Sequence, residues 1–326
     1  MATIIHPSIV RRGVQGAFRE AYDQAPIVRD RLAMTVPSTT RQEEYAWMGG
    51  PRGVEEWLGD RKAVNLPDRS FTIKNKLWED NLPMDMSDLE DDQVGHYPIL
   101  ARTLGQQAAE HPDDLLFDLI NNGHSSGYTA YDGAIFFSAS HVEGENTAQD
   151  NDIGFTVAAA NTSEPTAAEC QQMADKAIYS LMSFKNWAGK KFSKVVKNLT
   201  IVVPPTMGRI FEEAFTAAFI AKLSSGAGST AAGGSSENIW AKNYDVRIIC
   251  DGRLTESSTM TTSRYVYVFN TGLPIRPFVY QVRRPFQEKY DESELFKRNK
   301  TSWGVDARYN VGYGAWWTAV RITVAT

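Results

Sequence analysis

Five carboxylates gather in one short stretch of the chain: Asp85, Asp88, Glu90, Asp91 and Asp92. Clustered acids could bind a divalent metal ion for hydrolysis, because hard cations take several oxygen ligands. These acids, however, extend along a predicted strand-to-helix junction without the glycine-bearing spacing of a calcium loop. Acidic side chains in a first turn cap the free N–H groups of a helix. We therefore predict that Asp88, Asp91 and Asp92 cap a helix, and a metal-dependent hydrolase is the alternative.

A second possible chemistry involves Ser140, His141 and Asp132, which are the residue types of a hydrolase triad. An adjacent serine and histidine rarely face each other productively, so the triad interpretation is weak. His124 and His141 also form no HExxH pair and have no cysteine close in sequence. We predict surface or turn positions for these two histidines. The sequence therefore predicts no catalytic residue, no metal ligand and no cofactor.

Residues 224–236 (SSGAGSTAAGGSS) are rich in glycine and include Gly226, Gly228, Gly233 and Gly234. A phosphate-binding loop would follow a strand and end in Lys-Ser or Lys-Thr, and this segment does neither. Its composition is typical of a flexible surface loop.

Composition excludes several classes of protein and selects none. The chain has 326 residues, of which 42% are hydrophobic and 22% charged, as in an ordinary soluble protein of one large domain or two. No apolar run approaches the roughly 20 residues that span a bilayer, so we expect no membrane contact. Cys170 and Cys250 form no disulfide framework, which favours a reducing cytoplasm. The net charge of −5 is opposite to that of a protein that coats nucleic acid.

The first 92 residues divide into two parts. Residues 1–40 contain a short run with rough helical spacing that Pro26 limits, and the remainder is predicted to be an extended arm. Residues 41–92 carry thirteen Asp and Glu and seven Lys and Arg around thinly spread aromatic residues. Such a segment buries too little apolar surface to offset its backbone entropy, about 1–2 kcal/mol per residue. We predict a long two-stranded loop whose packing comes from a neighbouring copy of the same chain.

A long helix is predicted from about Asp88 to Gly123, because apolar residues recur at steps of three and four. Pro112 is expected to kink or restart this helix, with Asp113 and Asp114 in the new first turn. Gly123 is the natural stop.

The remaining chain predicts an α+β body with a mostly antiparallel sheet. One helix follows Pro165, and Thr206 is expected to cap another that extends to Phe219. The end, from Trp303 to Val324, alternates enough to predict a terminal hairpin. The other predicted strands are 134–137, 199–203, 246–250, 265–269 and 278–282.

This order of parts resembles the HK97-type major capsid fold, and the sequence most closely resembles the Mu-like phage major head subunit (gpT) family. The resemblance lies mainly in the first 141 residues. The matching stretches are GVQGAFREAY (13–22), EEYAWMGGPRGVEEWLGDR (43–61), FTIKNKLWEDNLPMDMSDLEDDQVGHY (71–97), LGQQAAEHPDDLLFDLINNG (104–123) and YDGAIFFSASH (131–141).

The resemblance implies a division of the chain into named parts, with the glycine-rich loop near the centre of a capsomer. The parts are an N-terminal arm (1–40), an extended loop over an adjacent subunit (41–88), a peripheral domain with a spine helix (89–160), an axial domain (161–274) and strands that return to the peripheral domain (275–326).

The resemblance also implies a structural protein rather than an enzyme. Copies would form hexamers and pentamers of an icosahedral shell, with Trp47, Trp57, Phe71 and Trp78 buried on neighbouring subunits. The expected partners are scaffold or protease, portal and decoration proteins, and the shell would enclose double-stranded DNA without sequence-specific binding. The protein would be assembled in the host bacterial cytoplasm and reside in the virion. The alternative with the same fold is an encapsulin-like shell of a cellular compartment.

Overall fold

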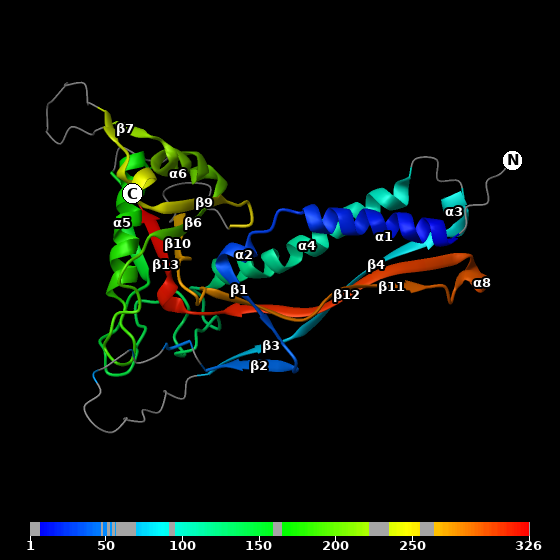
Figure 1. The fold of residues 1–326 in the computed structure, drawn as a ribbon, viewed down its shortest axis with the longest axis horizontal. Coiled ribbons are helices and arrows are strands. Elements are labelled where there is room, and N and C mark those ends of the chain that lie inside the picture. Colours follow the sequence, from blue (N-terminus) through cyan, green and yellow to red (C-terminus); the bar gives the residue numbers. More distant parts are fainter. Residues whose placement is uncertain are drawn as a thin grey trace.

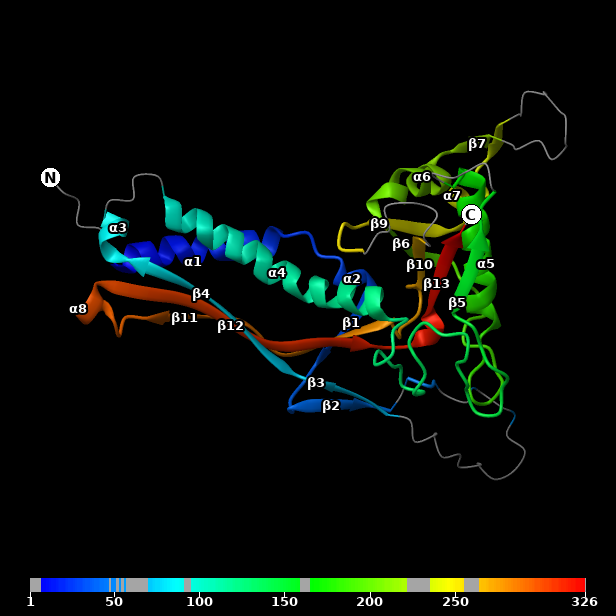
Figure 2. The same cartoon turned by 180° about the vertical axis from the view of Figure 1, so that it is seen from behind.

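The computed structural model describes residues 7–46, 48–50, 53, 56, 70–90, 95–158, 165–221, 235–254 and 264–325. The molecule is L-shaped, with an elongated half and a compact half that meet at one corner (Figure 1). The elongated half contains a long twisted sheet and two long helices. The compact half contains the second large sheet and its covering helices. Figure 2 shows the same arrangement from behind.

The elongated half is built on a four-stranded sheet in the order β1-β11-β12-β4. Its strands are β1 (Ala33–Pro37), β11 (Phe278–Asp291), β12 (Lys300–Tyr313) and β4 (Lys76–Asp85). Only the β1–β11 pair is parallel, and a short helix, α8 (Leu295–Arg298), connects β11 to β12. Exposure alternates along the distal part of β11, as expected for a strand with one covered face.

Two helices, α1 (Pro7–Gln24) and α4 (His96–Asn122), lie along one face of this sheet (Figures 1 and 2). They are buried together with β12 in one hydrophobic cluster that includes Phe18, Leu104 and Trp303. The Phe18 and Trp303 rings meet edge to face at 5.1 Å. The N-terminal residues thus form a packed helix, and the following α2 (Arg29–Leu32) and β1 replace the extended arm that the sequence predicts.

The compact half is built on a five-stranded sheet in the order β5-β13-β10-β6-β9. Its inner pairs are antiparallel and its two edge pairs are parallel, so the sheet is mixed. The strands are β5 (Asp152–Thr156), β13 (Ala319–Ala325), β10 (Arg264–Asn270), β6 (Asn198–Val203) and β9 (Asp245–Cys250). The helices and the small hairpin are α5 (Ala167–Ser183), α6 (Pro205–Thr216), α7 (Ile239–Asn243), β7 (Phe219–Ala221) and β8 (Ser235–Glu237).

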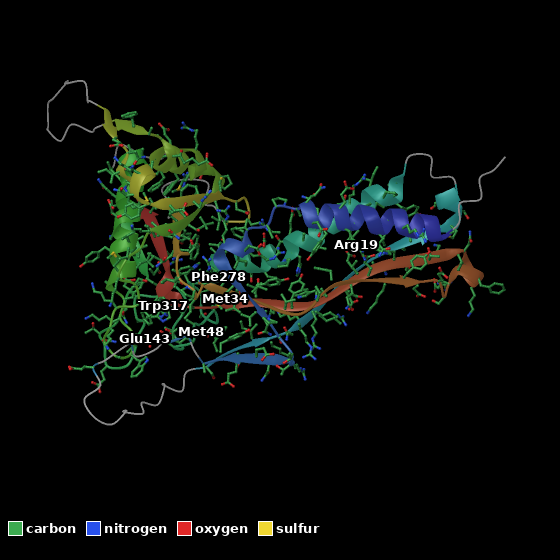
Figure 3. All side chains as sticks on the ribbon, in the orientation of Figure 1. Arg19, Met34, Met48, Glu143, Phe278 and Trp317 are labelled. Carbon is green, nitrogen blue, oxygen red and sulfur yellow. The ribbon has the colours of Figure 1, made fainter. Side chains whose placement is uncertain are left out.

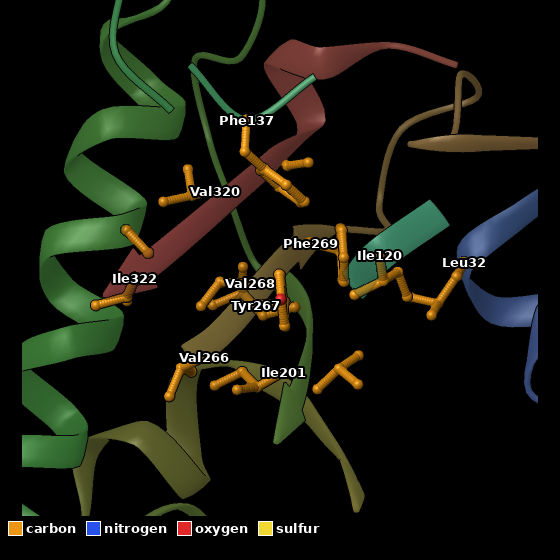
Figure 4. Close-up of a cluster of buried hydrophobic side chains, with 14 of the residues drawn as sticks. Leu32, Ile120, Phe137, Ile201, Val266, Tyr267, Val268, Phe269, Val320 and Ile322 are labelled. Atoms are coloured by element: carbon orange, nitrogen blue, oxygen red, sulfur yellow. The ribbon is translucent and has the colours of Figure 1, made fainter. Parts of the chain in front are cut away.

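One continuous core joins the two halves. Val268 and Phe269 of β10 pack with Val320 of β13, and Leu32 and Ile120 reach this cluster from the elongated half (Figure 4). The chain also crosses directly from β12 to β13 through a 3-10 turn, Trp316–Thr318, whose side chains are buried. The two halves therefore share packing at the corner of the L.

The predicted helix after Pro165 is confirmed as α5, and the predicted strands near 199–203, 246–250 and 265–269 are confirmed as β6, β9 and β10. The strand predicted at 278–282 is the beginning of β11, which extends to Asp291.

Other local predictions are wrong, and each has a structural reason. The long helix begins at His96, after Gly95 at φ 70°, and it continues through Pro112, so it does not restart there. β12 and β13 lie in different sheets instead of forming a terminal hairpin, because the Trp316 turn directs the chain into the compact half. Residues 134–137 form bends around a single bridge at Ile135 instead of a strand. Helix α6 begins at Pro205 and ends at Thr216, so Thr206 is not its cap and Phe219 belongs to β7.

The packing of α1 on α4 depends on Gly105. A Cβ atom at this position would overlap the Phe18 carbonyl oxygen and approach the Ala21 Cβ to 3.2 Å. We expect Gly105→Ala to lower the free energy of unfolding by about 1–3 kcal/mol in urea titrations, because backbone has to move. Gly16→Ala on α1 is the matched control, since nothing lies within 4 Å of a Cβ there. It should raise stability by up to about 1 kcal/mol, and equal effects of the two substitutions would contradict the close approach.

Candidate inter-subunit surfaces

The highly charged segment begins as a small two-stranded ribbon separate from both large sheets. β2 (Gln42–Tyr45) pairs antiparallel with β3 (Phe71–Lys74), and Tyr45 lies opposite Phe71. The next strand, β4, belongs to the sheet of the elongated half, where Trp78 lies opposite Ala307. The final part of residues 41–88 is therefore hydrogen-bonded to β12 of the same chain along the length of β4.

Of the four aromatic residues predicted to contact a neighbour, Trp47 and Trp57 lie outside the described residues. Phe71 and Trp78 are described, and both are half-buried against their own chain. The Trp78 indole Nε1 donates a hydrogen bond to the Tyr309 carbonyl oxygen at 3.0 Å. Its ring lies 4.4 Å from the His111 ring, centre to centre. Both residues thus have intrachain partners, and contact of their remaining surface with another copy stays a prediction.

Trp78 also lines a hollow of about 380 Å³ between β4 and α4. Burial lowers the pKa of His111 in this wall, and its Nδ1 lies 2.7 Å from the Tyr309 hydroxyl oxygen. The rim carries Glu79, Asp80 and Glu110, for which no ion pair occurs among the described residues. The hollow between β4 and α4 therefore combines apolar walls with acidic side chains.

The beginning of the segment between β2 and β3 is anchored at the corner of the molecule. Met48 is fully buried, and its carbonyl oxygen accepts a hydrogen bond from the Trp317 indole at 3.1 Å. Figure 3 shows Met48 and Trp317 together at this corner. The Gly50 carbonyl accepts a hydrogen bond from Trp187 at 3.3 Å, and Gly50 has φ 70°, a conformation that favours glycine. The segment is consequently fixed to its own body just after β2.

None of the described acidic residues of the cluster lies in the first turn of the long helix. Asp88 lies in the first turn of a separate short helix, α3 (Met86–Glu90), whose Ser87 N–H donates to Asp85 Oδ1 at 2.9 Å. Helix α4 has no acidic residue in its first turn. Asp91 and Asp92 lie outside the described residues, as do Gly226, Gly228, Gly233 and Gly234. Within the described ranges, no group of three or more His, Cys, Asp or Glu residues could hold a metal ion.

His141 is buried, which contradicts its predicted surface or turn position. Its Nδ1 lies 2.7 Å from Asp132 Oδ2, its Nε2 lies 3.1 Å from the Phe136 carbonyl oxygen, and its ring stacks on Trp316 at 4.1 Å. Ser140 Oγ is instead 2.9 Å from Ser138 Oγ. Both ring nitrogens are therefore occupied, and the geometry offers no base to Ser140.

Residues 123–127 (GHSSG) match the spacing of a serine nucleophile elbow. An elbow lies between a strand and a helix, whereas this stretch directly follows the end of α4. His124 is exposed, as predicted for a surface histidine. The pattern is therefore a helix-terminating turn.

A surface that sequence reasoning missed lies on the compact half. Tyr179, Val195 and Ile239 are 78%, 66% and 65% exposed, although they are large and apolar. The sequence contains one indication of this exposure. Tyr179 lies outside the apolar stripe of α5, which includes Ile178 and Leu181. The other two residues come from a loop and a five-residue helix, where no periodicity marks an exposed face.

The turn between β1 and β2 depends on the Glu43 carboxylate. Glu43 Oε1 accepts hydrogen bonds from Ser38 Oγ, Thr39 N and Thr40 N at 2.8, 2.9 and 3.1 Å. These bonds, with that of Ser38 the largest contribution, lower the pKa of Glu43 to about 2. Because the folded-state pKa is depressed, the stabilisation is present above the unfolded pKa of about 4.3 and is lost as the pH falls toward 2.

We therefore expect Glu43→Gln to lower the urea midpoint at neutral pH, and the difference from the wild type to shrink as the pH falls from about 5 to about 2.5. Glu44→Gln, an exposed neighbour on the same strand, is the control and should cause no such pH-dependent difference. A Glu43→Gln effect that stays constant across this range would show that its charge does not stabilise the turn.

Comparison with known proteins identifies the family of this chain. A family model for the Mu-like prophage major head subunit gpT matches residues 8–167 and 251–324. The chain belongs to this family. The chain is 36% identical over 129 residues to the Mu-like prophage FluMu major head subunit of Haemophilus influenzae. This matched region covers 40% of this chain and 41% of that relative. It is 33% identical over 124 residues to the major capsid protein of Escherichia phage Mu, covering 38% and 40%.

The matched region of this gpT-family chain thus spans about two fifths of each curated relative. Its structure is similar to a chain in the procapsid of bacteriophage JBD30, with a TM-score of 0.54 and 20% identity over 98% of this chain and 76% of that one. At this identity the likeness establishes the fold alone. The HK97-type α+β fold predicted from the sequence is confirmed. No helix within the described ranges has the length and apolarity that a membrane crossing requires.

Proposed function

We propose that this chain is the major capsid subunit of a tailed, Mu-like phage. Its membership of the gpT head-subunit family is the observation that carries the proposal. In this role, copies of the chain form hexamers and pentamers, which assemble into an icosahedral shell around double-stranded DNA. Its net charge of −5 suits a container wall that must not bind the packaged DNA tightly. The role is structural, without catalysis or a cofactor, and the chain is assembled in the host bacterial cytoplasm.

The geometry supports this role through the segment that includes β2 and β3. An isolated two-stranded ribbon is marginal in water, and the connecting residues are dominated by charge. We assign residues 38–75 as the extended loop, because β1 before it and β4 after it belong to the sheet of the elongated half. The elongated half is then the peripheral domain, and the compact half the axial domain.

Electron microscopy of particles tests the proposal directly. The chain is expressed with the assembly proteins of its phage, namely scaffold or protease, portal and decoration proteins, and closed shells are expected. Small discrete oligomers alone under these conditions would overturn the proposal. Nuclease-protected DNA inside the shells supports a phage head, whereas a protein cargo supports the encapsulin-like compartment instead.

A further inference from the structure

Three large apolar side chains of the compact half are exposed to solvent. Tyr179 of α5, Val195 of the loop before β6 and Ile239 of α7 are each at least 65% exposed, and we call them the α5–α7 face. Val195 and Ile239 border one hollow of about 400 Å³, and Ile178, next to Tyr179 in the chain, lines it as well. Grouped apolar exposure of this kind marks an interaction surface.

The hollow has an apolar floor and a cationic rim. Met182, Val196 and Tyr244 contribute to its lining, and Lys194 and Lys197 lie at its edge. Both lysines are exposed, and neither forms an ion pair with a described residue. A partner that complements this surface presents an apolar side chain accompanied by carboxylates.

The same half carries such a surface on different elements. Glu212 and Glu213 are exposed on the outer face of α6, and the described residues provide no ion-pair partner for either carboxylate. Phe219 follows in β7 and is 66% exposed. We call Glu212, Glu213 and Phe219 the α6–β7 ridge.

We propose that the α6–β7 ridge of one copy docks on the α5–α7 face of the next copy, with Phe219 in the hollow and the two glutamates facing Lys194 and Lys197. The contact joins two different surfaces of one chain, so it is heterologous and generates rings when the rotation closes. The inference rests on the proposed capsid function and adds the surfaces through which axial domains meet around a capsomer.

Charge reversal tests the contact from both sides. Lys194→Glu with Lys197→Glu makes both surfaces acidic, and Glu212→Lys with Glu213→Lys makes both basic. Each double variant alone should lose ring and shell assembly, because like charges then meet at every contact. The quadruple variant should regain assembly. Lys185→Glu, an exposed lysine of the same half outside the hollow, is the matched control and should assemble normally.

Mixing the two double variants sharpens the test, because every contact is complementary when the variants alternate around a ring. A ring of six can alternate and a ring of five cannot, so hexamers should return while closed shells should not. Sedimentation velocity and electron microscopy measure both outcomes, and unchanged urea midpoints show that the exposed substitutions leave the fold intact.

Normal shells from either double variant alone would overturn this contact and leave the proposed function standing. Failure of the wild type to form any shell would overturn the proposed function instead. The contact is then still decided by whether the two double variants associate with each other in sedimentation while neither associates with itself.

Discussion

Asp113→Ala is expected to lower the free energy of unfolding by about 3–5 kcal/mol, because it leaves a buried guanidinium without its counter-charge. The Asp113 carboxylate is fully buried and accepts hydrogen bonds from Val28 N at 2.7 Å, Arg29 N at 3.2 Å and Arg29 Nη1 at 3.2 Å. Arg29 itself is 8% exposed and also donates to the Ala109 carbonyl at 2.7 Å. Urea titration followed by circular dichroism measures the loss.

Two further variants test whether the loss of stability comes from the unpaired buried charge. Arg29→Met combined with Asp113→Leu replaces both charged groups with apolar side chains, and it should recover part of the lost stability. The remaining loss comes from the Val28 and Arg29 N–H groups, which lose their carboxylate acceptor. Asp118→Ala, at an exposed position on the same helix, should change stability by no more than about 1 kcal/mol. A cost for Asp113→Ala as small as that for Asp118→Ala would mean that the pair does not hold α2 against α4.

Asp113 also shows what sequence patterns can and cannot predict. Its position after Pro112 predicts a cap for a restarted helix, which is a local hydrogen bond. In the structure the carboxylate caps α2 instead, with a partner 84 positions away in the chain. Local spacing identifies a residue suited to accept N–H groups, but only the assembled fold determines which N–H groups reach it.

The same distinction applies to whole elements. The apolar stripe of α5 and the short apolar runs of β6 and β10 are local patterns, and all three elements are confirmed. The pairing of strands is not local, because alternation identifies a strand without naming its neighbour. β12 and β13 both alternate, yet they join different sheets. The family resemblance supplied the overall fold that periodicity alone could not provide.

The sequence also predicts poorly which side chains are exposed, for a related reason. Aromatic residues in a charged segment suggest contact with another copy, but Trp78 turned out to bond to Tyr309 of its own chain. Conversely, Val195 and Ile239 look like ordinary core residues in the sequence and are exposed in the structure. Residue type does not report exposure, which depends on how distant elements cover one another.

Replacing residues 54–69 with a short glycine–serine linker should abolish shell formation and leave the body folded. The linker removes Trp57 and most of the connecting charge, but it retains the ribbon of β2 and β3 and the anchors at Met48 and Gly50. Trp78 also stays, because it belongs to β4. Electron microscopy should show no shells, and the urea midpoint should remain within experimental error of the wild type.

A matched control replaces residues 224–232, which already consist mainly of glycine, serine, alanine and threonine, with the same type of linker. This control should still assemble, because its composition hardly changes. Normal shells from the 54–69 replacement would show that the extended loop is not required between subunits. If shells are lost while the unfolding free energy is unchanged, the missing stabilisation must have acted between copies, because every described contact of the loop within its own chain is preserved.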